Sequence, residues 1–267
     1  MQILFVILMF IWGAAMGSFL CCQAWRLRLR LQGKKIKNSR SVCLRCHHQL
    51  KWYENLPIIS WLAQGGKCRH CGQKIGALEI ISELSVGTAL ALLATTINVT
   101  TATAFEWGIF VITIAFMLAL CFLAIYDGKW GELPTPALIL AIMLALSLAA
   151  LRIWSESATI GLSWAQVLDT LYSVAILGGI YLLLYLVSRG RWVGDGDWLL
   201  GLAIGAALSS PWLALCALFI ANFSACLIMY PVVRKRKTKK IYFGPFLVLA
   251  FVVSATFANF LLSLVVW

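Results

Sequence analysis

The chain is rich in apolar residues and poor in charge. Of its 267 residues, 62% are hydrophobic and 12% are charged, whereas a soluble domain is about 45–50% apolar. A water-soluble fold of this size could not hide so much apolar surface in one core. The composition therefore excludes an ordinary soluble domain and predicts a membrane protein whose excess apolar surface faces lipid.

The formal net charge of +12 comes mainly from two basic clusters. Twelve Lys or Arg residues lie between Arg26 and Lys74, and six more lie between Arg234 and Lys240, together 18 of the 22. Basic clusters beside apolar spans mark cytoplasmic loops and are attracted to anionic lipid headgroups. The charge pattern thus predicts contact with membrane lipid and argues against nucleic-acid binding.

Eight apolar segments have, or approach, the length of a membrane-crossing helix, about 17–25 residues. In chain order they are residues 3–24, 79–97, 105–125, 135–151, 166–187, 198–210, 212–233 and 245–266, the sixth being short. With the N-terminus outside, the cytoplasmic loops are 25–78, 126–134, 188–197 and 234–244, which hold 21 of the 22 Lys and Arg residues. Seven or nine spans would put a basic loop on the wrong side, so the pattern favours an all-α polytopic fold with about eight transmembrane helices.

The first cytoplasmic loop, residues 25–78, is too small and polar to fold around a core of its own and needs a cross-link. It contains two Cys-x-x-Cys pairs with 21 residues between them, Cys43 with Cys46 and Cys68 with Cys71. This pattern indicates a tetrahedral four-cysteine zinc site, and four thiolates would close the coordination shell, so the zinc would be structural. Disulfides or free thiols are the alternatives, and a reducing cytoplasm disfavours disulfides.

The chain has four aspartates, and three of them fall at one predicted membrane face. Asp127 ends the third span, and Asp195 and Asp197 lie in a Gly-Asp-Gly-Asp sequence before the sixth. Ionisable groups at membrane depth are costly, so each needs a reason to be there. Asp169 opens the fifth span on the opposite side, where we expect an ordinary helix-start residue.

Two carboxylates that meet across the helix bundle would share a proton. The ionised member can take a proton from water while the other protonates the scissile carbonyl or the leaving amine, which hydrolyses a peptide without metal or nucleophile. Helix capping is the alternative role for Asp197, but not for Asp127, because a helix C-terminus repels negative charge. No His residue lies in or beside a span, which argues against Ser-His and HExxH mechanisms.

Five short motifs, in order along nearly the whole chain, resemble those of the prepilin peptidases, also called type IV leader peptidases. They are Gly17-Ser18-Phe19-Leu20, the segment Asn55-Leu56-Pro57-Ile58-Ile59-Ser60-Trp61-Leu62 between the cysteine pairs, Asp127 with Leu133-Pro134, Gly194-Asp195-Gly196-Asp197, and Phe243-Gly244-Pro245-Phe246. Each motif alone is weak evidence, whereas five in register are specific.

The resemblance implies an aspartic endopeptidase of the bacterial inner membrane, with Asp127 and Asp197 as catalytic residues facing the cytoplasm. Its substrates would be type IV prepilins, or the pseudopilins of protein secretion, cut after the glycine of a short basic leader. Many members also methylate the new N-terminus from S-adenosylmethionine. The implied division is an N-terminal region, 1–104, with the zinc loop and the methyltransferase-like part, and a peptidase membrane domain, 105–267.

Glu83 opens the second span and matches a family glutamate. It is the candidate for the methylation cofactor, with a helix-start acid as the alternative. Three other positions depart from the family pattern, namely Cys21 in place of Asn, Thr135 in place of the acid after Leu-Pro, and Leu199 in place of Lys. Because both aspartates are present and Cys21 lies in the region linked to methylation, the departures bear on methylation more than on cleavage.

The resemblance implies substrates with basic leaders, so we expect acidic residues at the cytoplasmic face to recognise them. Those in or beside the predicted cytoplasmic loops are Glu54, Glu79, Glu132 and Asp195. The basic run at 234–240 would repel such leaders, so we expect it to serve topology and lipid contact.

Two other functions compete with the leader peptidase interpretation. A GxGD intramembrane protease with another substrate, of the signal-peptide or presenilin type, would lack a cytoplasmic loop with four cysteines between its first two spans. A non-enzymatic transporter or scaffold with a zinc knuckle is the second alternative. Transport predicts polar residues near the middle of several spans, and no acidic or basic residue lies there in this chain.

Overall fold

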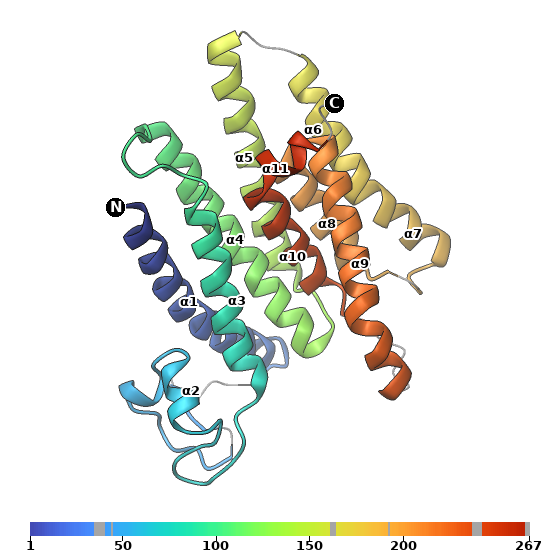
Figure 1. The fold of residues 1–267 in the computed structure, drawn as a ribbon. Helices are drawn as coiled ribbons and strands as arrows, with labels where there is room; N and C mark the ends of the chain where they lie inside the picture. Colours follow the sequence, from blue (N-terminus) through green and yellow to red (C-terminus); the bar gives the residue numbers. More distant parts are fainter. Residues whose placement is uncertain (35–40, 44, 161–163, 192, 237–241, 265–267) are drawn as a thin grey trace. The chain divides into compact units, whose positions relative to one another are not determined.

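The computed structural model is all-helical over the residues that it describes, which are all except 35–40, 44, 161–163, 192, 237–241 and 265–267 (Figure 1). The predicted all-α fold is confirmed for this part of the chain, which contains two isolated β-bridges and no strand. The chain divides into two compact units, Met1–Thr100 and Thr101–Trp267. The end of the basic run, from position 237 onward, lies outside the described residues.

The first unit is built on two long helices, α1 (Gln2–Leu31) and α3 (Ala77–Ala94). They pack closely because α1 carries glycines at the contact. A Cβ at Gly17 would lie 2.6 Å from the backbone oxygen of Ser82, and one at Gly13 would lie 2.9 Å from the Cα of Gly87. The segment between the helices holds the short helices η1 (Trp52–Glu54) and α2 (Ile59–Ala63). Two tightly packed helices thus form the base of the cysteine-containing loop.

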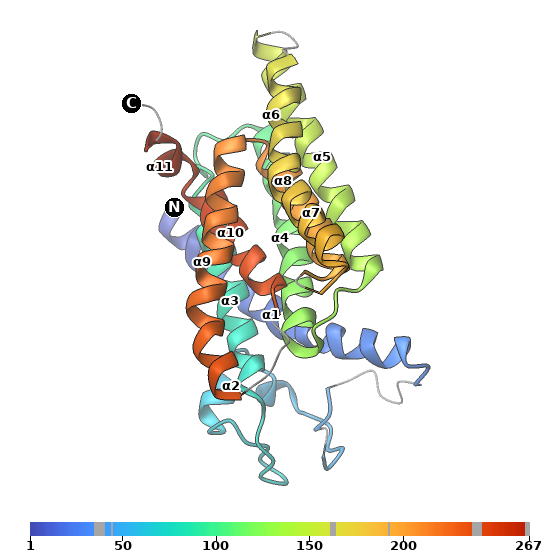
Figure 2. The same cartoon turned by 90° about the vertical axis from the view of Figure 1, so that its right-hand side faces the viewer.

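The second unit consists of the helices α4 to α11. Their bounds are α4 Ala104–Trp130, α5 Thr135–Ile160, α6 Trp164–Val174, the π-helical η2 Ala175–Gly179, α7 Ile180–Ser188, α8 Asp195–Leu208, α9 Pro211–Arg236, α10 Gly244–Thr256 and α11 Ala258–Ser263. The short helix α8 packs against α5, α6, α7, α9 and α10 (Figure 2). Gly201 and Gly205 allow this, because a Cβ there would lie 2.9 Å from the Leu177 oxygen and 2.7 Å from the Ser173 oxygen.

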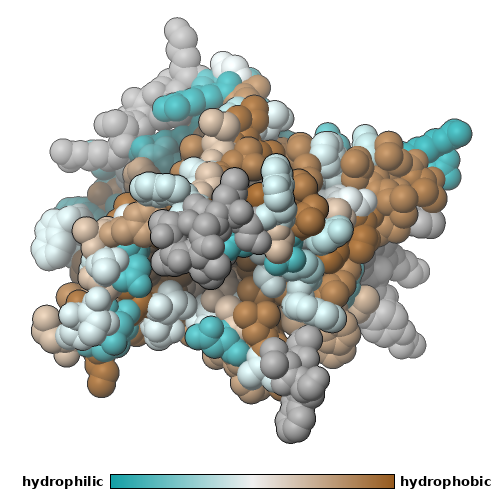
Figure 3. Space-filling model, turned by 90° about the horizontal axis from the view of Figure 1, so that it is seen from above, coloured by the Kyte–Doolittle hydropathy of each residue, from teal (hydrophilic) through white to brown (hydrophobic). Residues whose placement is uncertain are grey.

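Six helices of the described chain are long and apolar enough to cross a membrane. They are α1, α3, α4, residues 135–155 of α5, the run from α6 through α7, and residues 211–229 of α9. The other two predicted segments, 198–210 and 245–266, fall on the shorter helices α8 and on α10 with α11. Many large apolar side chains of these helices are exposed, and apolar side chains lie among polar ones on the face seen in Figure 3. Such exposure is expected for helices that face lipid.

Candidate active site and zinc site

Asp127 lies in the last turn of α4, where a negative charge is disfavoured by the helix dipole. Asp127 is only 5% exposed to solvent. Its Oδ2 accepts a 2.9 Å hydrogen bond from the backbone N–H of Gly244, the first residue of α10. The partly positive start of one helix therefore compensates the carboxylate at the end of another. This contact explains how an acid can occupy the position that the sequence singled out.

Asp197 lies in the first turn of α8 and is partly buried. It stands before the predicted span 198–210, and its helix is not among the six candidate membrane spans. Its Oδ2 accepts a 3.0 Å hydrogen bond from the backbone N–H of Gly194, so the carboxylate also serves as a helix-start acid. Burial raises the pKa of Asp197 to about 6. The hydrogen bond from Gly194 acts in the opposite direction, and the negative charge of Asp195 raises the pKa further.

The segments that carry the two aspartates meet through Leu133 and Gly196. Gly131 ends α4 with a φ of 66°, and the chain then runs to Leu133 and the buried Pro134. A Cβ at Gly196 would lie 2.7 Å from the Cβ of Leu133, so the first turn of α8 lies directly on the segment after α4. The helix α10 packs against both α4 and α8. One cluster of the second unit thus contains three of the five sequence motifs.

The remaining acidic candidates fall into two groups. Glu132 and Asp195 are exposed beside Leu133 and Gly196. In the first unit, Glu54 accepts from the backbone N–H of Lys51 at 2.9 Å, and Glu79 accepts from the thiol of Cys21 at 2.9 Å. Asp169 lies exposed in α6.

Glu83 is buried in α3 and holds a turn of the loop. Its Oε2 accepts a 2.7 Å hydrogen bond from the backbone N–H of Ile58. Ile58 has a φ of 61°, which is rare for a β-branched residue, and the Ile59 N–H bonds the oxygen of Pro57 at 2.5 Å in a γ-turn. Glu83 therefore stabilises a strained backbone conformation between the two cysteine pairs. Its sequence position alone did not reveal this contact.

The four loop cysteines converge. Their Sγ atoms all lie within 4.8 Å of one another, and those of Cys43 and Cys71 are 3.7 Å apart. A tetrahedron with Zn–S bonds of about 2.3 Å requires sulfur atoms about 3.8 Å apart. The distance and the donor type fit a zinc ion, so the predicted cluster could hold one.

Both cysteine pairs have the same backbone turn. The Cys43 N–H bonds the His48 oxygen and the His47 N–H bonds the Cys43 oxygen, and Cys68 makes the matching pair of bonds with Gln73 and Gly72. Positive φ angles at His47 and Gly72, 57° and 68°, close these turns. Hydrogen bonds from the backbone of Cys46 and Arg45 lower the pKa of Cys43 from 9.0 to about 6 against an opposing effect of burial. The pKa of Cys46 is instead raised to about 11, because a backbone hydrogen bond from His48 that lowers it is outweighed by desolvation and by hydrogen bonds with the other three cysteines of the cluster. Without a bound ion, the turn thus favours the thiolate form at Cys43 and not at Cys46.

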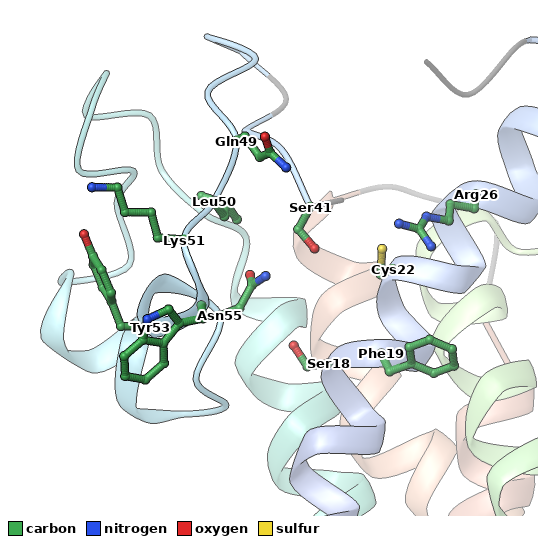
Figure 4. A pocket seen from close by; sticks show the side chains of 11 residues that line it. Ser18, Phe19, Cys22, Arg26, Ser41, Gln49, Leu50, Lys51, Tyr53 and Asn55 are labelled. Atoms are coloured by element: carbon green, nitrogen blue, oxygen red, sulfur yellow. The ribbon is translucent and has the colours of Figure 1, made fainter. Parts of the chain in front are cut away.

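A cavity of about 990 Å³ opens in the first unit between α1 and the loop (Figure 4). Figure 4 shows Ser18 and Arg26 of α1 pointing toward the loop segment, with the Phe19 ring on the other side of the helix. The lining residues are Ser18, Phe19, Cys22, Arg26, Ser41, Gln49, Leu50, Lys51, Trp52, Tyr53 and Asn55. They combine hydroxyl and amide groups, two cations and three aromatic rings. Sequence reasoning missed the cavity because most of these residues lie in a loop without periodicity.

Comparison with known proteins gives matches along most of the chain. The family model described as "Bacterial Peptidase A24 N-terminal domain" matches residues 11–97, within the first unit. A prepilin leader peptidase/N-methyltransferase of Dichelobacter nodosus is 30% identical over 218 residues, which are 79% of this chain and 68% of that protein. The chain belongs to the prepilin leader peptidase family.

Other members of the prepilin leader peptidase family match over different lengths. The type 4 prepilin-like proteins leader peptide-processing enzyme of Escherichia coli is 27% identical over 87% of each chain. A prepilin leader peptidase/N-methyltransferase of Myxococcus xanthus is 42% identical over 32% of this chain, a stretch that covers 24% of that relative. The chain therefore matches only about a quarter of the Myxococcus protein. No solved structure matches.

Family membership and several apolar helices together identify a multi-pass membrane protein. The family assignment favours the leader peptidase interpretation over the presenilin-type protease and over the zinc-knuckle transporter. The structure adds two contacts that were not predicted from the sequence, and one of their residues, Gly244, belongs to the Phe-Gly-Pro-Phe motif. The hydrogen bond between Glu83 and Ile58 could not be predicted from a local pattern, because it joins residues 25 positions apart.

Zinc removal should loosen the loop of the first unit. We expect purified wild-type protein to contain one zinc per chain, and Cys43→Ser or Cys71→Ser to contain almost none and to be cut by trypsin within the loop. The reason is that structural zinc contributes about 10 kcal/mol or more to the folding of small zinc domains. Elemental analysis of protein prepared under reducing, chelator-free conditions measures the content, and Cys226→Ser, an exposed cysteine of α9, is the matched control. Zinc-free wild-type protein would contradict the four-cysteine assignment.

Proposed function

We propose that this chain is a membrane-embedded aspartic endopeptidase that removes the leader of type IV prepilins or pseudopilins at the cytoplasmic face of the bacterial inner membrane. The observation that carries the proposal is the cluster of the second unit. There the segment after Asp127 packs on the first turn of α8, which contains Asp197, through Leu133 and Gly196. The names of the matched relatives supply the substrate class.

In the proposed reaction one aspartate is ionised and the other is protonated. The ionised carboxylate takes a proton from water as the water oxygen bonds to the scissile carbonyl carbon, and the protonated one gives its proton to the carbonyl oxygen. As the tetrahedral intermediate collapses, the proton taken from water passes to the leaving amine, and the second aspartate regains its own. Burial and the charge of Asp195 raise the pKa of Asp197 to about 6, which favours this residue as the protonated member of the pair.

Exposed acidic residues support recognition of a basic leader. Glu132 and Asp195 lie exposed beside the Leu133–Gly196 contact, so a cationic segment that approaches the aspartates would pass near their charges. Glu54 and Glu79 belong to the first unit, where their carboxylates accept hydrogen bonds from Lys51 and Cys21. We therefore assign leader recognition in the second unit to Glu132 and Asp195.

Zinc would be held by Cys43, Cys46, Cys68 and Cys71. When bound it supplies a cross-link between the two cysteine turns and, with its shell closed by four thiolates, no catalytic water. The turns flank the segment whose γ-turn is held by Glu83. The zinc site and Glu83 together would then order the loop that walls the cavity.

N-methylation of the new N-terminus is the second proposed activity, and the cavity is the observation that favours it. S-adenosylmethionine would supply the methyl group when bound. Arg26 can pair with a carboxylate, and the rings of Trp52 and Tyr53 can contact an adenine or a sulfonium cation. Glu83 would act as a positioning residue, because the turn that it holds begins two residues after Asn55 of the cavity wall.

Substitution of each aspartate should distinguish the two catalytic residues from the other two aspartates. We expect Asp127→Asn and Asp197→Asn each to lower the cleavage rate at least about 100-fold without loss of expression, because an amide cannot share or release a proton as an acid does. Asp195→Asn should be milder, and Asp169→Asn in α6 is the harmless control. Intact mass of a co-expressed prepilin reports leader loss. If Asp197→Asn cleaved at a near-normal rate and Asp195→Asn did not, the choice of the second catalytic residue would be wrong.

A change in the cavity should affect methylation alone. Trp52 is 78% exposed, so Trp52→Ala should leave the fold and leader cleavage intact while weakening S-adenosylmethionine binding at least about tenfold, a loss typical of one or two aromatic contacts. Calorimetric titration measures the binding, and the mass of the cleaved product reports the methyl group. Trp12→Ala, exposed on α1 and outside the cavity lining, is the control. Unchanged binding in Trp52→Ala would remove the cavity from the proposal.

A further inference from the structure

The start of α10 makes direct contact with the carboxylate of Asp127. The Gly244 N–H donates to Oδ2 at 2.9 Å, and both residues are buried. The next residue, Pro245, lies against the neighbour of Asp127, since a Cβ at Gly128 would be 3.9 Å from the Pro245 Cγ. Two consecutive residues of α10 thus lie on two consecutive residues of α4.

Position 244 has no space for a side chain. A Cβ there would lie 2.9 Å from Oδ2 of Asp127 and 3.3 Å from both its Cβ and its Cγ. Gly244 is not among the glycines with a positive φ, so its backbone conformation is open to alanine. The glycine is therefore required by the approach of the Asp127 carboxylate and not by a turn.

The start of α10 is also fixed on other sides. The ring of Phe243 packs edge-on against the ring of Tyr181 in α7, with centroids 5.3 Å apart. The Tyr181 hydroxyl in turn accepts a 3.0 Å hydrogen bond from Asn222 of α9, and α10 itself packs against α4, α8 and α9. A backbone N–H held by this many contacts cannot follow Asp127 if the carboxylate rotates.

We propose that Phe243-Gly244-Pro245 is a positioning element of the peptidase site, and that Gly244 sets the orientation of the Asp127 carboxylate. The inference rests on the proposed function, because it concerns how one of the two proposed catalytic aspartates is held. One oxygen of Asp127 is bound by the fixed amide, which directs the other oxygen. A side chain at 244 would turn the carboxylate away from its working position, and a displacement of about 1 Å can cost about 100-fold in rate.

The first test compares Gly244→Ala with Gly108→Ala in the full-length protein. Gly108 lies in α4, and a Cβ there would meet nothing within 4 Å. With a synthetic prepilin in detergent, Gly244→Ala should lower kcat about 100-fold with KM within about twofold of wild type, and Gly108→Ala should match wild type. The rate is therefore expressed per folded enzyme, because a merely structural role would reduce the amount of folded protein and leave the kcat of the remaining folded enzyme at the wild-type value. Wild-type kcat in Gly244→Ala, or an equal loss in both variants, would overturn the proposal.

A second measurement does not depend on activity. The thermal midpoint is compared for wild type, Gly244→Ala, Asp127→Ala and the double variant. If the carboxylate is the obstacle, Gly244→Ala should lower the midpoint or the folded yield in the wild-type background and have little effect beside Asp127→Ala. Equal effects in both backgrounds would refute the contact. The cleavage activity of Asp127→Asn distinguishes the proposed peptidase function from the proposed role of Gly244. An active Asp127→Asn would contradict the peptidase function. An inactive Asp127→Asn together with a normal Gly244→Ala would contradict only the positioning role.

Discussion

A buried carboxylate at the wrong end of a helix is the constraint on which the second unit depends. Asp127 ends α4, where the helix dipole opposes its charge, and it is almost completely shielded from water. The charge is compensated by the start of α10, 117 positions later in the chain, where the backbone N–H of Gly244 donates a hydrogen bond to the carboxylate. That requirement fixes α10 against α4, forces a glycine at 244, and so limits how the neighbouring α8, with Asp197, can pack.

The first unit follows a different principle, in which a small polar segment is held by cross-links. Its base is a helix pair made close by Gly13 and Gly17. The loop has little apolar core, and its order comes from two matching cysteine turns and from the Glu83 bond that holds the γ-turn at Ile58. The cavity lies between this loop and α1. Backbone turns and hydrogen bonds, more than hydrophobic packing, therefore hold the wall of this cavity.

Local patterns in the sequence predicted the elements, and contacts between distant residues decided the site. Apolar length alone located the helices, and the Cys-x-x-Cys spacing located the thiol cluster, because each is a property of a short window. Asp127 could be singled out because an acid at a helix end has no local explanation. Gly244 was part of a recognisable motif, but its contact with Asp127 could not be predicted, since no pattern around position 127 refers to position 244. The strained backbone at Ile58 and the Glu83 hydrogen bond that stabilises it were hidden for the same reason, as was a cavity lined by loop residues.

In the proposed reaction two carboxylates activate water directly, with no covalent acyl-enzyme. The most direct measurement is cleavage of a synthetic prepilin in H₂¹⁸O with added hydroxylamine, followed by the mass of the released leader. Direct attack by water predicts a leader whose new C-terminal carboxylate carries one ¹⁸O, with no hydroxamate at any hydroxylamine concentration. A leader that ends in a hydroxamate would reveal an acyl-enzyme formed by a nucleophilic side chain, and would contradict the aspartate pair as the source of catalysis.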